Sequence, residues 1–244
     1  MNDIYLYLKV LAALAPAIII LIVILRRDKK NPEPLKWIFA AVGFGVLAGL
    51  SIIFVWSLFL PVITVDSYLT AAFDAFVCAA IPEELMKYAF LWILIKRNKH
   101  FNELFDGIVY AVCIAMGFAG LENILYVLGD DDWFMVSISR ALLSVPAHYF
   151  FAVLMGYFVS LAIVANRADM PRYVLLGLVV PILAHGIYDT LCFSLSVNEE
   201  FASTVLLIFL LGFNWLRKHV KKLVASHIKA DEMVITNTQN RMMP

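Results

Sequence analysis

The sequence predicts an all-α, polytopic bundle of transmembrane helices with about seven spans. Three observations lead to this fold class. Of the 244 residues, 63% are hydrophobic and only 16% are charged, which leaves too little polar surface to cover a soluble globule. The apolar residues form long runs, and the charged residues gather between these runs.

Each apolar run is close to or longer than the roughly 20 residues that a membrane-spanning helix needs. The last run is the shortest. The first run is expected to remain as a helix and not to be cleaved as a signal peptide, because its basic cluster follows the apolar stretch. The predicted spans are residues 4–25, 35–60, 68–95, 105–128, 133–164, 173–195 and 201–216.

The charges between the runs predict the orientation. Basic residues follow the first, third, fifth and seventh runs, whereas acidic residues follow the fourth and sixth. Because basic loops favour the cytoplasmic side of a membrane, the N-terminus is expected outside and the C-terminus in the cytoplasm. We expect a multi-pass protein of a bacterial plasma membrane. We expect one transmembrane domain over residues 1–223, with its core motifs in residues 68–195, and a flexible cytoplasmic tail over residues 224–244.

Several ionisable residues lie inside the apolar runs. On the third run, Glu83 and Glu84 are spaced four and three residues before Lys87, so that one helical face can carry an internal ion pair. Each such group costs about 2.5–3.5 kcal/mol at the centre of a spanning helix. A structural ion pair explains one glutamate, but the second exceeds what one lysine neutralises. Pro82 predicts a kink or local opening at this level.

Two histidines lie at matching depth on other runs, His148 halfway along the fifth and His185 halfway along the sixth. Asp189 lies one turn after His185 on the same face, where it can orient the imidazole ring. Two histidines and a glutamate suit either a metal-bound water, with Glu83, His148 and His185 as ligands, or a metal-free glutamate that deprotonates water. The sequence leaves a divalent metal such as zinc, or no cofactor, equally open.

Supporting roles are expected for a second group of polar residues. Arg140 precedes His148 by about two turns and can pair with Glu122 on the fourth run, beside Asn123. Asp106 is expected to cap the start of the fourth helix. Small residues, among them Gly117, predict close helix packing next to Glu122.

These residues together resemble the PrsW family of intramembrane proteases, which is related to the CAAX prenyl endopeptidases and the Abi proteins. The resemblance covers the third to sixth spans. It is carried by Pro82-Glu83-Glu84-Leu85-Met86-Lys87, by Phe105-Asp106-Gly107-Ile108-Val109-Tyr110 running to Gly117-Phe118-Ala119 and Glu122-Asn123, and by His148 and His185-Gly186-Ile187-Tyr188-Asp189.

The resemblance implies a role for each matching residue. Glu83 is similar to the glutamate that activates water and Glu84 to its supporting neighbour, whereas His148 and His185 are similar to the histidines that hold the water and the scissile carbonyl. The chain departs from the CAAX group, which has arginine where Tyr88 stands here and often asparagine at the last position of the second histidine motif. CAAX prenyl substrates are therefore not expected.

The resulting prediction is an intramembrane endopeptidase that cleaves a membrane-anchored protein in the outer half of the bilayer, as the resemblance implies for anti-sigma factors. The expected partners are a substrate with a single span and the lipid bilayer, with no nucleic acid. The sequence also leaves open a proton- or metal-coupled transporter and a non-catalytic scaffold or immunity protein, because both can carry buried acids and histidines.

Overall fold

The computed structural model describes residues 2–59, 65–198 and 201–242, and every regular element in these ranges is a helix. Two pairs of α-helices are joined without a break by a short π-helical segment, so that the chain forms seven helical rods within the described ranges. The rods are α1 (Asn2–Arg27), α2 (Leu35–Phe59), α3–η1–α4 (Tyr68–Phe73, Asp74–Ala80, Ile81–Arg97), α5 (Leu104–Gly129), α6–η2–α7 (Trp133–Ser139, Arg140–Ser144, Val145–Val164), α8 (Met170–Ser194) and α9 (Ala202–Met242).

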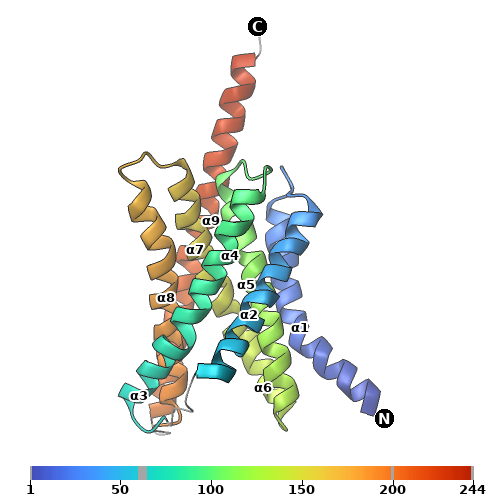
Figure 1. Ribbon diagram of the computed structural model, residues 1–244, viewed down its shortest axis with the longest axis vertical. Coiled ribbons are helices and arrows are strands. Elements are labelled where there is room, and N and C mark those ends of the chain that lie inside the picture. Colours follow the sequence, from blue (N-terminus) through green and yellow to red (C-terminus); the bar gives the residue numbers. More distant parts are fainter. Residues whose placement is uncertain (1, 60–64, 199–200, 243–244) are drawn as a thin grey trace.

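The predicted fold class is confirmed. Five rods in the described ranges are long and apolar enough to cross a membrane, namely those formed by α1, α2, α5, α6–η2–α7 and α8. The count of seven spans and their orientation remain predictions. The two ends of the chain lie at opposite ends of the bundle, as an odd number of crossings requires (Figure 1).

Helix α5 is the central element. It is packed by α1 and α2 on one side and by α7 on another (Figure 1), and 89% of its apolar window is buried inside the protein. Glycines allow the closest approaches. A Cβ atom at Gly117 would overlap the carbonyl oxygen of Val42 on α2, and one at Gly156 on α7 would overlap the carbonyl oxygen of Gly107. The close packing predicted at Gly117 is confirmed.

Both π-helical segments lie directly before polar residues of the predicted site. Segment η1 ends two residues before Pro82, and η2 ends two residues before Pro146. Proline has no amide hydrogen and crowds the preceding turn, so widened turns fit the chain at these positions. The opening predicted at Pro82 is therefore present as a π-helical segment.

The C-terminal region is helical as far as the structure describes it. We expected residues 224–244 to be loosely ordered, but α9 continues as a helix to Met242. This helix packs against α5, α7 and α8. The buried side chains of Val224, His227 and Asp231 explain why the helix continues beyond the predicted domain, because all three contact the bundle and not solvent.

Candidate active site

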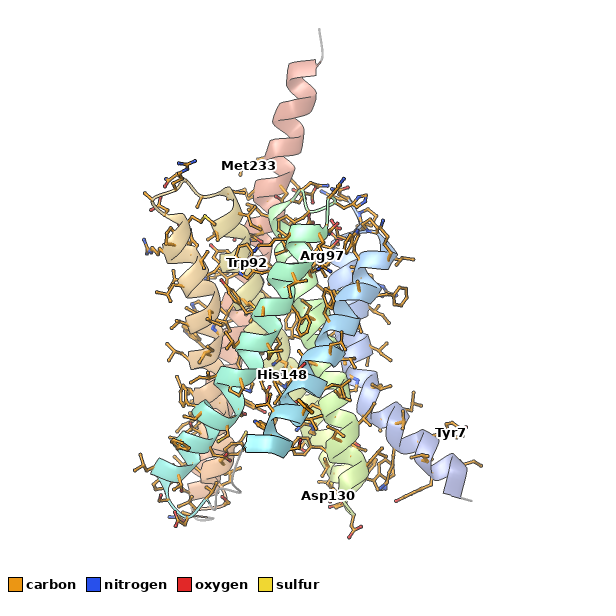
Figure 2. The ribbon with its side chains drawn as sticks, in the orientation of Figure 1. Tyr7, Trp92, Arg97, Asp130, His148 and Met233 are labelled. Atoms are coloured by element: carbon orange, nitrogen blue, oxygen red, sulfur yellow. The ribbon has the colours of Figure 1, made fainter. Side chains whose placement is uncertain are left out.

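Four ionisable side chains from three helices meet near the middle of the bundle. Glu83 and Glu84 come from α4, His148 from α7 and His185 from α8, and each is 5% exposed or less. Figure 2 shows His148 between the end marked by Arg97 and the end marked by Asp130. The matched depth that the sequence predicts for these residues thus corresponds to a single cluster.

Lys87 lies at the centre of the cluster. Its Nζ atom donates hydrogen bonds to Glu84 Oε1 at 2.9 Å and Glu83 Oε2 at 3.2 Å, and it lies 3.3 Å from His148 Nδ1. The ammonium also lies 3.9 Å from the centroid of the Phe118 ring. One buried cation therefore faces two carboxylates, an imidazole and an aromatic ring.

His185 connects two carboxylates on different helices. Its Nδ1 atom lies 2.9 Å from Glu84 Oε1, and its Nε2 atom lies 3.1 Å from Asp189 Oδ2 and 3.9 Å from Glu83 Oε2. Phe151 stacks on the imidazole, with the ring centroids 4.8 Å apart. Both edges and one face of the imidazole are thus held by neighbouring side chains.

His148 contacts a different carboxylate, that of Glu122 on α5. Its Nε2 atom lies 2.9 Å from Glu122 Oε2, which also forms an ion pair with Arg140 Nη2 at 2.8 Å. Arg140 Nε donates to Asn123 Oδ1 at 2.6 Å, and Asn123 Nδ2 donates to the carbonyl oxygen of Ala13 at 3.0 Å. The structure thus brings all nine sequence-predicted site residues into one network that spans α1, α4, α5, η2, α7 and α8.

Segment η1 and helix α8, which lie beside the site, pack closely against each other. A Cβ atom at Gly186, next to His185, would overlap the ring of Phe76 in η1. The widened turn of η1 therefore places an aromatic ring directly against α8, at the point where α8 presents its histidine.

The four central residues fit a divalent metal by donor type and spacing. Glu83, Glu84, His148 and His185 each offer one ligand atom, and these atoms lie within 4.8 Å of one another. Carboxylate oxygen and imidazole nitrogen are the donors of catalytic zinc sites. Lys87 is the group that competes with a metal, because its ammonium already contacts three of the four residues.

Two cavities reach the cluster from different sides. One, of about 180 Å³, is lined by Glu122, Arg140, His148, His185 and Asp189 among others. The other, of about 110 Å³, is lined by Glu83 and Glu122 together with apolar side chains of α2 and α5. Because Glu122 and Tyr126 line both cavities, the two spaces adjoin each other beside the cluster.

Sequence reasoning missed three features of the site. Phe151 was not singled out, although it follows His148 by three residues on the same helical face. Pro146 precedes His148 by two residues, as Pro82 precedes Glu84, and this spacing could have indicated His148 as a site residue. The aromatic contact between Phe118 and Lys87 joins α5 to α4 and depends on packing that no local pattern reveals.

Comparison with known proteins identifies relatives over most of the chain. A family model described as PrsW family intramembrane metalloprotease matches residues 33–216. A protein named Protease PrsW from Bacillus subtilis (strain 168) is 33% identical over 86% of this chain and 93% of its own length. Proteins of the same name from Clostridioides difficile (strain 630) and Geobacillus kaustophilus (strain HTA426) are 31% and 33% identical, over 82% and 74% of this chain and 84% and 77% of their own lengths. No solved structure matches the chain.

Proposed function

This chain belongs to the PrsW family of intramembrane metalloproteases, and from that premise we propose that it cleaves a single-span membrane protein by water that Glu83 activates. The family makes the protein a peptidase, and its apolar helices and bacterial relatives make it a multi-pass protein of the plasma membrane. The transporter and scaffold alternatives are thereby set aside.

The observation that carries the mechanism is the different position of the two adjacent glutamates. Glu84 Oε1 lies within hydrogen-bond distance of both Lys87 Nζ and His185 Nδ1, at 2.9 Å each. Glu83 has a longer contact with Lys87, at 3.2 Å, and it lines the cavity between α2 and α5. The less restrained carboxylate, next to open space, is the better placed general base.

The remaining groups fit complementary roles. Glu83 takes a proton from water as the water attacks the scissile carbonyl, and it returns the proton to the leaving amine. His148 and His185 line the adjoining cavity and stabilise the oxyanion. Glu84 and Asp189 orient His185, because an ionised carboxylate accepts and cannot donate a hydrogen bond.

A divalent metal, when bound, would be held by Glu83, His148 and His185 and would polarise the water and the carbonyl. The chain's own groups keep their positioning roles in either case. Glu122 orients His148, Arg140 fixes Glu122, and Asn123 fixes Arg140.

The cavity beside Glu83 suits an apolar side chain of the substrate next to the scissile bond. Its α2 wall is formed by Gly49, Ile52, Ile53 and Trp56, of which Ile53 and Trp56 are more than a third exposed on the outer surface of the bundle. A spanning segment in the surrounding lipid could reach Glu83 along this wall. The resemblance to the family favours an anti-sigma factor as this substrate, cut in the outer half of the bilayer.

The test is cleavage of a purified single-span reporter in proteoliposomes by wild type and by His148→Ala, each with and without a chelator. We expect wild type to cut the reporter and His148→Ala to lose about 100-fold or more of the rate. Loss of wild-type cleavage on chelation, restored by added zinc, selects the metal-bound water; unchanged cleavage selects the metal-free glutamate. Wild-type rates from folded His148→Ala would contradict the proposed site.

A further inference from the structure

A second cluster of carboxylates lies at the other end of α5 from Glu122. Asp28, just after α1, and Glu103 and Asp106, at the start of α5, each place one oxygen within 4.8 Å of the others. Asp106 precedes Glu122 by 16 residues, which corresponds to about 24 Å along a helix. The mechanism above uses none of these three residues.

The negative charge of this cluster has no basic partner. Among the described residues, no lysine or arginine nitrogen forms an ion pair with Asp28, Glu103 or Asp106, and the nearby Lys30 pairs with Glu232 at 2.6 Å instead. Asp28 is 4% exposed and Asp106 is fully buried. Burial, and then the charges of neighbouring carboxylates, raise the pKa of Asp28 to about 7. The ionised form of this cluster therefore requires a cation close by.

Two further carboxylates surround the cluster, and both already have hydrogen-bond partners. Asp231 on α9 accepts from the amides of Leu104 and Phe105, at 2.9 Å each, and so caps α5 from another helix. Glu33 accepts from the Tyr110 hydroxyl. These two carboxylates add negative charge, but they already accept hydrogen bonds from the protein.

A separate observation points to a ligand. The Oδ2 atom of Asp106 accepts from the amides of Asn102 and Glu103, at 2.8 and 2.9 Å, which fixes the carboxylate in place. Its Oδ1 atom is buried and has no hydrogen-bond partner among the described residues. Leaving a buried carboxylate oxygen without a partner is costly, and a bound cation would supply that partner.

We propose that Asp28, Glu103 and Asp106 bind a hard divalent cation, Ca²⁺ or Mg²⁺. Carboxylate oxygens are the ligands that both ions prefer, and oxygens bound at about 2.4 Å to one Ca²⁺ lie no more than about 4.8 Å apart, a limit that the oxygens of this cluster meet. The side chain of Asn31 donates to Glu103 Oε1 at 2.9 Å and orients that ligand.

The surroundings provide room and access for the ion. A cavity of about 30 Å³, lined by Asp28, Glu103 and Asp231 and also by Arg27 and Lys30, has space for a water on the ion. A larger, open cavity of about 750 Å³, lined by Asn31, Glu103 and Asp231 among others, provides an entry path. The bound ion would tie the loop after α1 to the start of α5, next to the Asp231 cap from α9.

The test is thermal unfolding of the purified full-length protein in detergent, with chelator alone and with millimolar Ca²⁺ or Mg²⁺. Wild type is expected to unfold several degrees higher with at least one ion, in a saturable manner. Asp28→Asn and, independently, Glu103→Gln should weaken the apparent affinity about tenfold or more. Asp131→Asn, an exposed acid outside the cluster, serves as the matched control and should keep the full shift.

Glu83→Gln separates this site from the catalytic cluster, and it should also keep the full shift. The ion that gives the saturable shift identifies the preferred cation. The proposal is overturned if neither ion shifts wild type, if Asp28→Asn and Glu103→Gln keep the wild-type response, or if Glu83→Gln abolishes it. Because the readout is stability, its failure is distinct from a failure of the proposed peptidase.

Discussion

Each ionisable residue at the candidate active site is held by at least one group of opposite charge or by a hydrogen bond. Lys87 faces Glu83 and Glu84, and Glu122 is shared between Arg140 and His148. Removing one partner of a buried pair leaves an uncompensated charge, which costs several kcal/mol. The network therefore fixes the position of each imidazole more firmly than any single contact would.

Arg140 tests whether this network positions His148. In Arg140→Met, Glu122 loses its arginine partner and holds His148 less firmly, so we expect kcat to fall about 10- to 100-fold with little change in KM. Arg140→Lys keeps the charge and should recover part of the loss. The measurement is steady-state cleavage of the reporter in proteoliposomes.

Arg172→Met is the matched control, because Arg172 is exposed at the start of α8. It should cleave like wild type. Equal kcat values for folded Arg140→Met and wild type would show that Arg140 has no positioning role.

At the scale of the helices, glycines set how closely α5 approaches its neighbours. A Cβ atom at Gly45 on α2 would overlap the carbonyl oxygen of Ile114 on α5, whereas one at Gly43, half a turn away, would meet nothing within 4 Å. The same α2–α5 interface carries the wall of the cavity that reaches Glu83. Helix packing and the shape of the proposed substrate site are therefore coupled.

Gly45→Ala is expected to push α2 away from α5 and to lower the free energy of unfolding by about 1–3 kcal/mol. Gly43→Ala on the same helix should be neutral or stabilising by up to about 1 kcal/mol, because alanine favours helix more than glycine does. Both are measured by thermal or denaturant unfolding in detergent. Equal destabilisation by the two substitutions would contradict the close contact at Gly45.

The sequence predicts those parts of the site that local spacing determines. Glu83 and Lys87 pair within one helix, and their depth follows from the helical rise, so the all-α fold and the facing acid and histidines were predictable. The contact between Glu122 and His148, and the cap that Asp231 provides to α5, join residues 26 and more than 100 positions apart. Such contacts depend on how helices pack, which one sequence does not reveal.

At the scale of the whole molecule, the rods place an acidic loop and a basic loop at opposite ends of the bundle, and the orientation in the membrane remains a prediction. The N-terminus of α1 and the C-terminus of α9 lie at opposite ends of the bundle (Figure 1), and the loop with Asp130 lies at the opposite end from Arg97 (Figure 2). Acidic and basic loops thus occupy different ends, as the distribution of charges across a membrane favours.

Cysteine labelling tests this orientation. In a background with the three native cysteines replaced, we expect Asp131→Cys to react with a membrane-impermeant maleimide applied to intact cells. Ala168→Cys, in the loop before α8, should react only after the membrane is opened, although both positions are exposed in the protein. Reaction of Ala168→Cys alone in intact cells would reverse the predicted orientation.

The most direct measurement of the central claim is single-turnover cleavage of a single-span substrate by wild type, Glu83→Gln and Glu232→Gln, with the cut bond located by mass spectrometry. Wild type and Glu232→Gln, which loses an exposed ion pair with Lys30, should give the same two fragments with new ends inside the substrate's span. Glu83→Gln should fold and bind substrate but release neither fragment. The same fragments at wild-type rate from folded Glu83→Gln would contradict the role of Glu83 as the base.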